Sequence, residues 1–396
     1  MAERKLKPGW RTVKFGDVVR LSKARCADPL AEGVERFVGL EHLEPGDLRI
    51  RSWGNVADGV TFTSAFKPGQ VLFGKRRAYQ RKVAVADFSG VCSGDIYVLE
   101  SQDANVLIPE LLPFICQTDA FFDHAVGTSA GSLSPRTNWT SLADFEFLLP
   151  PVEAQRRIVE ALLSAEVLLE ALRTSQFALK KVRSSLAVEY FASPSRHTLK
   201  PCSELITSRD LSLQTGPFGT VLKASAYQAS GHPIINPVNM KDGALSIEDG
   251  PFVGEEDWER LEKYWMRSGD MVMGRKGDMS NLIFVRAEYD RFLVGSDCIR
   301  FRVDPSRMHQ RYFFHFLRSE TTQNWIQGQA YGTVMPGINE KILGRLMAYI
   351  PPLVEQEQIA AEFDEIETSL SKISGRFEDS LALKATLLSG ALTAED

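Results

Sequence analysis

Two stretches of the chain, residues 151–193 and 351–396, carry apolar side chains at the spacing of a coiled coil. In the first stretch, the residues seven positions apart are Ile158, Ala165, Leu172, Leu179 and Leu186, with Leu162, Leu169 and Tyr190 in a second row. In the second stretch they are Ile359, Ile366, Ile373 and Leu387, accompanied by Phe363, Leu370 and Phe377. The pattern predicts two long helices of about 38 residues, which would each span roughly 57 Å.

Polar residues interrupt both apolar rows, at Gln176 and Arg183 in the first stretch and at Ser380 and Lys384 in the second. The simplest way to bury two such rows is for the helices to pack against each other. We expect an antiparallel coiled coil with an approximate two-fold axis, which would hold two domains at its opposite ends. The alternative is two ordinary amphipathic helices, each packed on its own domain.

The segments that precede these helices are expected to be domains of mixed α and β structure. Short runs rich in β-branched and aromatic residues alternate there with Gly, Pro, Asn and Asp. The expected strands cover 70–73, 82–86, 96–99 and 145–149, and then 233–235, 271–273, 282–286 and 298–303. Aromatic-rich helices are expected at 108–125 and 310–327. The predicted fold is therefore α+β, with two tandem α/β domains at 1–150 and 194–350, each followed by a long helix at 151–193 and 351–396.

The chain contains an internal repeat. The run Pro150–Ile158 returns as Pro351–Ile359, and Pro68–Arg76 matches Ser268–Lys276 at an offset of 200. A third match, at an offset of 201, joins Gly131–Pro135 and Asn138 to Gly332–Pro336 and Asn339. This period is too long for a solenoid, so it indicates duplicated domains. Proline is tolerated in the first helical turn and favours an extended residue before it, so each Pro-Pro pair is expected to end a strand and begin a helix.

Length and composition are those of an ordinary globular protein of two or three domains, with 396 residues, 44% hydrophobic and 24% charged. No apolar run approaches the roughly 20 residues needed to cross a bilayer, and the first residues lack the apolar core of a signal peptide. We therefore expect a cytoplasmic protein. Its five cysteines show no metal-binding or redox spacing and are expected to be reduced and buried.

Charge is distributed unevenly along the chain. The net charge is −5, which by itself argues against a nucleic-acid partner. Residues 353–396 contain ten acidic and three basic residues and thus carry −7, which leaves +2 for the rest of the chain. The acidity is concentrated in the last predicted helix, whose exposed face therefore suits contact with protein. The two domains remain free to present basic faces.

One basic segment has the composition of a DNA-binding loop. Between Phe66 and Asp87 the chain has no acidic residue, one tyrosine, Tyr79, and six bases: Lys67, Lys75, Arg76, Arg77, Arg81 and Lys82. Arginine and lysine neutralise phosphates, and arginine also reads guanine in the major groove. The predicted strand–turn–strand would let the turn enter a groove. The alternative is an ordinary solvated basic turn.

Two further segments of the second domain are candidates for DNA contact. Arg275 and Lys276 occupy the position that repeats Lys75 and Arg76. In the run Gln214–Thr220, Gly216 and Gly219 flank Pro217 and Phe218, and such a rigid loop is able to bring backbone N–H groups close to a phosphate. The alternative for this loop is a tight connection with Phe218 inserted into the core.

No catalytic motif stands in its required context in the sequence. The chain lacks the phosphate-binding GxxxxGK[ST] and GxGxxG patterns and the metalloprotease HExxH. The spacing GxSxG occurs at Gly127–Gly131, but it follows the expected helix 108–125, whereas the elbow of hydrolases follows a strand. The chain also lacks the Asn-Pro-Pro-aromatic motif of amino-methyltransferases, and it has no acidic pair typical of nucleases. Together with the duplicated scaffold, this favours a binding protein, with no catalytic residue and no metal site expected.

These features together resemble the specificity subunits of type I restriction–modification systems. The resemblance covers nearly the whole chain and depends above all on the Pro-Pro-x-x-Glu-Gln-x-x-Ile pattern at the head of each long helix. The first copy departs from it, because Ala154 stands where the pattern has Glu and Glu153 lies one place early. The segments 36–43 with 71–79, and Gly216–Gly219 with Gly274–Gly277, look like two classes of target recognition domain.

The resemblance implies that each recognition domain reads one half of a split DNA site and that the paired helices fix the gap. It also implies two methyltransferase subunits and two ATP-dependent restriction subunits as partners. S-adenosylmethionine, ATP and magnesium would belong to those partners, and this chain would hold no cofactor.

Two other functions compete with this interpretation. One is an enzyme with an unrecognised site, either a nuclease or a methyltransferase, which activity of the purified chain alone would reveal. The other is a coiled-coil scaffold that never contacts DNA. The basic residues between Lys67 and Lys82 argue against the scaffold, and failure to bind any duplex with partners present would favour it.

Overall fold

The computed structural model describes residues 7–192, 199–241, 243–248, 250–277, 279–330 and 337–391. Its contacts divide the chain into two compact units. Unit 1 comprises residues 1–173 together with 375–396, and unit 2 comprises residues 174–374. Each unit thus contains one of the expected α/β segments and one part of each long helix, and each is described here by itself.

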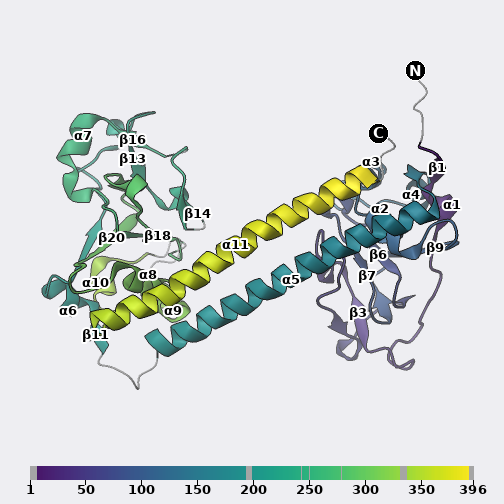
Figure 1. The fold of residues 1–396 in the computed structure, drawn as a ribbon, viewed down its shortest axis with the longest axis horizontal. Helices are drawn as coiled ribbons and strands as arrows, with labels where there is room; N and C mark the ends of the chain where they lie inside the picture. Colours follow the sequence, from purple (N-terminus) through teal and green to yellow (C-terminus); the bar gives the residue numbers. More distant parts are fainter. Residues whose placement is uncertain are drawn as a thin grey trace. The chain divides into compact units, whose positions relative to one another are not determined.

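The centre of unit 1 is an antiparallel sheet, and side chains on both of its faces are buried. Its strands lie in the order β2 (Val19–Leu21), β9 (Ile96–Ser101), β6 (Val71–Gly74) and β7 (Val83–Val85). Three of these strands, β6, β7 and β9, are labelled in Figure 1. Alternate side chains of a strand point to opposite faces. Phe73 therefore joins a core beneath the helices, whereas Leu72 joins a core beneath a second sheet. This explains why the sequence of β6 is apolar without interruption.

Helices and a second sheet cover the two faces of this central sheet. The second sheet has the order β4 (Gly54–Asn55), β3 (Arg36–Val38), β8 (Gly90–Cys92) and β5 (Ser64–Phe66). The helices are α1 (Phe15–Val18), α2 (Leu112–Ile115), α3 (Asp119–Gly127) and α4 (Trp139–Ala143), with short 3-10 turns η1 (Leu40–His42), η2 (Val56–Asp58), η3 (Ala78–Gln80) and η4 (Pro109–Leu111). Strand β1 (Arg11–Lys14) pairs with β10 (Glu146–Leu149), which leads into the first long helix.

Unit 2 repeats this plan. Its central sheet has the order β12 (Leu211–Thr215), β20 (Cys298–Val303), β17 (Met271–Gly274) and β18 (Leu282–Phe284). Strands β13 (His232–Ile235), β16 (Phe252–Val253) and β19 (Leu293–Val294) form the second sheet, β14 (Met240–Lys241) pairs with β15 (Ala244–Leu245), and β11 (Leu199–Pro201) pairs with β21 (Met347–Tyr349). The helical elements are α6 (Cys202–Thr207), α7 (Glu255–Arg260), α8 (Gln310–Arg318), α9 (Glu320–Gln329), α10 (Glu340–Leu343), η5 (Ala224–Ala226), η6 (Pro237–Asn239), η7 (Glu262–Tyr264) and η8 (Ala287–Tyr289).

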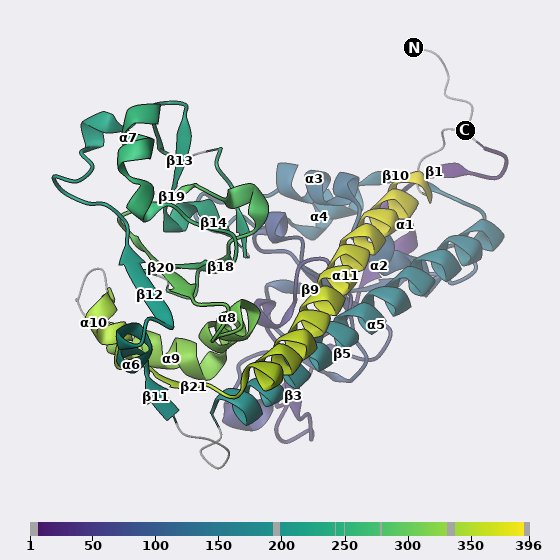
Figure 2. The same cartoon turned by 60° about the vertical axis from the view of Figure 1, so that its left-hand side comes forward.

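The two faces of the unit 2 sheet again bury separate cores. Met271 and Met273 contact the helical side, and Val272 contacts the side of the second sheet. Figure 2 shows α6, α8 and α9 on one side of β12, β18 and β20, and α7, β13 and β19 on the other. In both units one strand pair of the second sheet is parallel, β3 with β8 and β13 with β19. The sequence repeat is therefore a repeat of topology.

The long helices α5 (Val152–Phe191) and α11 (Leu353–Ala391) pack against each other within each unit. In unit 1, Lys384 forms an ion pair with Glu166. In unit 2, Gln176 Nε2 donates to Ser374 Oγ at 2.8 Å and Arg183 Nη1 lies 2.9 Å from Glu367 Oε1. Residue numbers fall along α11 as they rise along α5, so the pairing is antiparallel. The expected pairing is confirmed, and the alternative of two helices that pack only on their own domains is wrong.

The apolar rows predicted from the sequence lie in this helix pair or in the adjoining cores. Leu172 and Ile359 are buried, and Ile158, Leu179, Ile366 and Ile373 are half-buried. The polar interruptions are also accommodated, because Gln176, Arg183 and Lys384 each have a partner from the opposite helix. Lys384 is only 5% exposed and additionally donates from Nζ to Gln117 Oε1 at 2.9 Å. Three of the four interruptions are therefore specific polar contacts within the packing, whereas Ser380 Oγ donates to the Arg376 carbonyl of its own helix at 2.7 Å.

The repeated motif at the start of each long helix encloses a fully buried glutamine. Gln155 Oε1 accepts from the Ile108 backbone N–H at 2.9 Å, and its Nε2 donates to the carbonyls of Val106 and Pro150, each at 2.8 Å. Gln356 Oε1 accepts from the His309 N–H at 2.8 Å, and its Nε2 donates to the Pro351 carbonyl at 2.8 Å. Both side chains are 0% exposed. The motif thus joins the strand, the start of the helix and a third segment of the unit.

The eight predicted strands are present, but each of the two aromatic-rich helices is broken. The segment expected as one helix at 108–125 forms η4, α2 and α3, and Thr118 caps α3 by accepting from the Phe121 N–H. The segment expected at 310–327 forms α8 and α9, because Ser319 has extended backbone angles and caps α9. All five cysteines are free and buried, as predicted. Residues 332–336 of the repeat, and Asp278, lie outside the described residues.

Within the described part of the chain, no helix is long and apolar enough to cross a membrane.

Candidate nucleic-acid interface

The basic loop of unit 1 begins at Gly74, where β6 ends. It is held from both sides by backbone hydrogen bonds. Lys75 N–H donates to the Asp95 carbonyl at 3.0 Å, Thr137 N–H donates to the Lys75 carbonyl at 3.0 Å, and Arg77 N–H donates to the Pro135 carbonyl at 2.7 Å. The segment 130–137, which is remote in sequence, therefore lies alongside residues 75–77 as part of the same surface.

A single carboxylate organises the arginines of this surface. Arg136 Nε lies 2.7 Å and Arg76 Nη1 3.3 Å from the Asp95 carboxylate, and Arg76 also donates to Ser134 Oγ at 3.0 Å. The hydrogen bond from Arg136, followed by the contact with Arg76, outweighs burial and lowers the pKa of Asp95. Two guanidinium groups share one negative charge, so the cluster remains positive and is oriented before any ligand arrives.

The backbone of the basic loop has an unusual conformation at two arginines. Arg77 and Arg81 have φ values of 54° and 56°, in the left-handed region that residues with a Cβ rarely adopt. Non-glycine residues in this region typically cost on the order of 1 kcal/mol and are found preferentially at functional sites. Between them, Tyr79 has 55% of its surface exposed. The strained turn presents an aromatic ring beside the arginine cluster.

Two of the other three bases of the segment make contacts elsewhere in unit 1. Arg81 forms an ion pair with Asp119 and lies 4.7 Å from the centre of the Phe122 ring. Lys82 donates from Nζ to the Leu40 carbonyl at 2.7 Å. Lys67 is exposed. The structure therefore groups Lys75, Arg76 and Arg77 and places the two later bases in contacts within the unit, while their role in DNA binding stays a prediction.

The corresponding loop of unit 2 has the same construction. Arg275 N–H donates to the Asp297 carbonyl at 2.8 Å, and Ile338 N–H donates to the Arg275 carbonyl at 2.9 Å. Lys276 Nζ lies 2.6 Å from an Asp297 carboxylate oxygen. Asp297 thus plays the part that Asp95 plays in unit 1. The shared sequence Gly-basic-basic therefore marks a shared local structure.

The Gly216 loop adjoins this second basic loop. The strand register places Thr215 opposite Ile299 and Gly274 opposite Cys298, so β12 and β17 end at the same edge of the sheet. Gly216 is required there, since a Cβ would lie 2.1 Å from the Gly295 carbonyl oxygen. Phe218 is 64% exposed, so the alternative of a core residue is wrong. The structure brings Gly216, Phe218, Arg275 and Lys276 to one edge of unit 2.

Two basic residues near the first loop escaped the sequence prediction. Arg136 joins the cluster through tertiary pairing; its only sequence signal is its position directly after the repeated segment Gly131–Pro135. Arg25 and Lys75 line one cavity of about 590 Å³, with Tyr97 and Ser64 in its wall. The Lys75 ammonium lies 4.6 Å from the centre of the Tyr97 ring, a favourable cation–π distance. The candidate interface of unit 1 is therefore broader than the continuous basic run.

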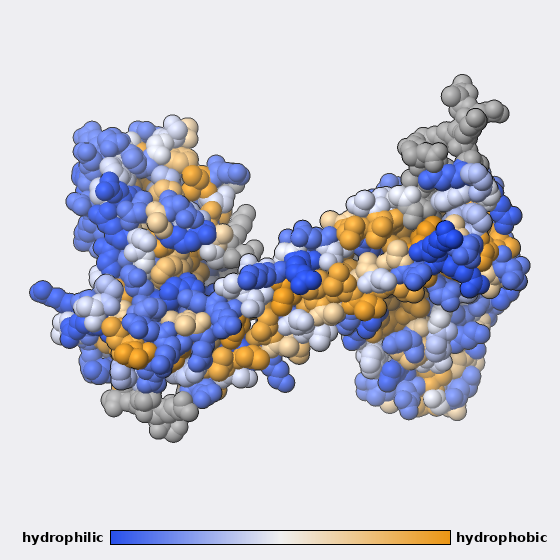
Figure 3. Space-filling model, viewed as in Figure 1, coloured by the Kyte–Doolittle hydropathy of each residue, from blue (hydrophilic) through white to orange (hydrophobic). Residues whose placement is uncertain are grey.

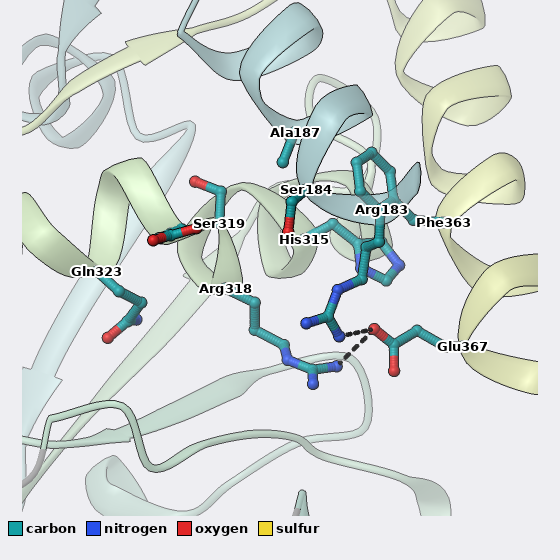
Figure 4. A pocket seen from close by; sticks show the side chains of 10 residues that line it. Arg183, Ser184, Ala187, His315, Arg318, Ser319, Gln323, Phe363 and Glu367 are labelled. Atoms are coloured by element: carbon teal, nitrogen blue, oxygen red, sulfur yellow. Dashed lines mark hydrogen bonds and ion pairs between the residues drawn. The ribbon is translucent and has the colours of Figure 1, made fainter. Parts of the chain in front are cut away.

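A second polar pocket, of about 300 Å³, lies in unit 2 where the long helices meet α8 and α9 (Figure 4). Arg183 and Arg318 point toward the same Glu367 oxygen, at 2.9 and 3.4 Å. His315, buried beside them, lies 2.7 Å from an Asp364 oxygen. Burial alone would raise the pKa of Asp364, but hydrogen bonds from His315 and Arg311 lower it to about 2. The arginines of this pocket are paired with carboxylates. These ion pairs join the long helices to the domain of unit 2.

Among the described residues, no group of histidine, cysteine, aspartate and glutamate is arranged to hold a metal ion.

Comparisons with known proteins identify one part of the chain by sequence and the whole chain by fold. Residues 219–376 match the family model of the type I restriction modification DNA specificity domain. The type I restriction–modification S subunit from M. genitalium is similar over 100% of this chain and 99% of its own, with a TM-score of 0.63 and 12% identity.

A second structure, described as showing complex assembly and conformational transition of the type I R-M system, covers 98% of both chains, with a TM-score of 0.59 and 16% identity. No curated protein matches the chain by sequence. By sequence, residues 219–376 are therefore similar to the type I restriction modification DNA specificity domain, and the chain as a whole shares the fold of the solved S subunit of a type I restriction–modification system.

Proposed function

We propose that this chain is the DNA-reading subunit of a type I restriction–modification complex and that each unit reads one part of a split DNA site. The observation that carries the proposal is the repeated construction of the two loops. Both begin at a glycine that ends a doubly buried strand. In both, the second base after that glycine is paired with a carboxylate, Arg76 with Asp95 and Lys276 with Asp297. Such preoriented bases suit phosphate contacts and base recognition.

The two loops differ enough to read different sequences. Unit 1 offers Arg76, Arg77, Arg136 and the exposed ring of Tyr79, whereas unit 2 offers Arg275, Lys276 and the exposed ring of Phe218. Arginine reads guanine bidentately, whereas lysine acts as a point charge. Two similar scaffolds with unlike loops therefore support a site with two different halves, and we propose that the paired helices fix the distance between these halves.

The long helices are the proposed docking surface for two methyltransferase subunits. Two ATP-dependent restriction subunits would then join this assembly. The exposed apolar residues of the helices support this proposal. On α5 they are Leu163, Val167, Leu168, Phe177, Val182 and Val188, and on α11 they are Val354, Leu381 and Leu383. Figure 3 shows apolar side chains at the surface over both helices. Methyl transfer, with S-adenosylmethionine, and ATP- and magnesium-dependent cleavage would then belong to the partners, and this chain would be non-catalytic and cytoplasmic.

DNA binding is tested by removing the charge of the unit 1 cluster. The variant Arg76→Ala/Arg77→Ala is compared with Arg11→Ala/Lys14→Ala, which removes two exposed bases from β1 of the same unit, outside the long helices. Affinity for a duplex that carries the methylated motif is measured against salt concentration, with the methyltransferase partners present. The slope of log K against log salt should fall by about 1 for each phosphate that the protein no longer neutralises, and only in the loop variant. Equal slopes for both variants would contradict the placement of the site.

Partner docking is tested separately on α5. The variant Val167→Asp/Leu168→Asp places two charges on its exposed apolar face, and Val126→Asp does so on α3. Assembly with the methyltransferase subunit is measured by light scattering after size exclusion. We expect only the α5 variant to lose the complex, because an unpaired charge in a buried interface is strongly unfavourable. Full assembly of the α5 variant would show that the docking surface lies elsewhere.

A further inference from the structure

The most exposed large apolar side chain among the described residues lies at the candidate DNA interface. Leu133 is 89% exposed, compared with 72% for Phe177, the next most exposed. It occupies the tip of the turn between Ala130 and Arg136, which close the turn with two mutual backbone hydrogen bonds of 3.0 Å. An isolated exposed leucine is ordinary at a protein surface. Leu133 differs from such a residue because its turn is bonded to the arginine cluster of Arg76, Arg77 and Arg136.

The turn that carries Leu133 is fixed to the basic loop. Pro135 accepts from the Arg77 N–H at 2.7 Å, and Ser134 Oγ accepts from Arg76 Nη2 at 3.0 Å. At the base of the turn, Arg136 lies 2.7 Å from Asp95. The backbone of the turn is therefore held against the basic loop, so the turn has little conformational freedom to lose when a ligand binds.

The surroundings of Leu133 identify the class of ligand. The guanidinium groups of Arg76 and Arg136 meet at Asp95. Arg76 also donates to Ser134, on the turn that carries the apolar tip. A protein partner that buried Leu133 would also have to bury or neutralise Arg76, Arg77 and Arg136. A DNA duplex offers both complements at once, phosphates for the arginines and the stacked faces of bases for the leucine. Leucine is among the apolar residues that proteins insert between base pairs.

We propose that Leu133 is a wedge that enters the base stack of the first part of the DNA site. This inference rests on the proposed DNA-reading function. The wedge separates one base step while Arg76 and Arg136 hold the flanking phosphates. Because base steps differ in how easily they unstack, the wedge adds sequence discrimination without a hydrogen bond to a base.

The test uses the complex with its methyltransferase partners and a duplex that carries the methylated motif. 2-Aminopurine, which brightens when unstacked, is placed in turn at each position of both half-sites, excluding the methylated adenines. Wild-type protein should increase the 2-aminopurine fluorescence at one base step. Leu133→Ser should abolish this increase and weaken DNA binding about tenfold, the effect expected from the loss of one buried leucine. Leu133→Phe should keep the signal. The control is Leu30→Ser, in a turn outside both the basic loop and the segment 130–137. It should change neither the fluorescence nor the affinity.

The possible outcomes separate the wedge from the DNA-reading function. Tight, motif-specific binding with the same 2-aminopurine pattern in wild type and Leu133→Ser would overturn the wedge and leave the DNA-reading function intact. Loss of partner assembly in Leu133→Ser, with the wild-type 2-aminopurine pattern in the complex that remains, would also overturn it and make Leu133 a protein contact. Failure of the wild-type complex to bind the motif at all would overturn the proposed function first.

Discussion

Replacing the buried glutamines at the start of the long helices tests how the domains are joined to those helices. Gln155→Leu keeps approximately the shape of the side chain but removes three hydrogen bonds, to Ile108, Val106 and Pro150. Gln356→Leu removes two, to His309 and Pro351. Each backbone group left buried without a partner costs roughly 1–3 kcal/mol.

The expected decrease in stability follows from these hydrogen bonds. At the lower end of that range, Gln155→Leu should reduce the free energy of unfolding by about 3 kcal/mol and Gln356→Leu by about 2 kcal/mol. Gln176→Leu is the control, because Gln176 is half-buried and has one hydrogen bond, to Ser374, in the helix pair. Its change should stay within about 1 kcal/mol.

Two measurements check these values. Urea unfolding gives the total decrease for each variant, and hydrogen exchange followed by mass spectrometry locates it. Peptides containing Ile108 should lose protection in Gln155→Leu, and peptides containing His309 should lose it in Gln356→Leu. A decrease below about 1 kcal/mol in both variants, with unchanged exchange at both amides, would refute the account of the motif as a buried polar junction.

Two further changes probe the helix pair and its pH dependence. Lys384→Met leaves Glu166 without its buried partner and should destabilise unit 1 by about 1–3 kcal/mol. The double variant Lys384→Met/Glu166→Met should recover most of this loss of stability. Additive effects in a double-mutant cycle would contradict the pairing. Burial lowers the pKa of His315, so stability in unit 2 should decline as pH falls below about 6.5, where the unfolded histidine takes up a proton more readily than the folded one. His315→Gln should flatten that decline in urea unfolding between pH 7.5 and 5, and an equally steep decline in the variant would assign it to other groups.

The sequence predicts the architecture well because the relevant signals are periodic and local. The sevenfold rows of leucine and isoleucine identify α5 and α11, and the continuous apolar runs at 71–73 and 271–273 identify strands buried on both faces. The repeat correctly predicts two domains of the same topology. The breaks at Thr118 and Ser319 were missed because both flanking segments are aromatic and helical in pattern, and the capping role of a single hydroxyl is not visible in that pattern.

The candidate site is less visible in the sequence because distant segments assemble it. Arg76 and Arg81 are neighbours in a basic run, yet left-handed backbone at Arg77 and Arg81 sends their side chains to different partners. Arg136 enters the cluster only through pairing with the loop 60 residues before it. The two glutamines are part of the recognised motif, but only the folded structure gives them their backbone partners.

The most direct test of the central claim is a map of methylated adenines in the genome of the source organism, with and without this gene. The account predicts that one split motif loses its methylation on deletion and regains it with the wild-type gene. Restoring the gene with Arg76→Ala/Arg77→Ala should reduce methylation of that motif, whereas Arg11→Ala/Lys14→Ala should restore it fully. An unchanged map after deletion would contradict the claim that this chain reads DNA for a methyltransferase.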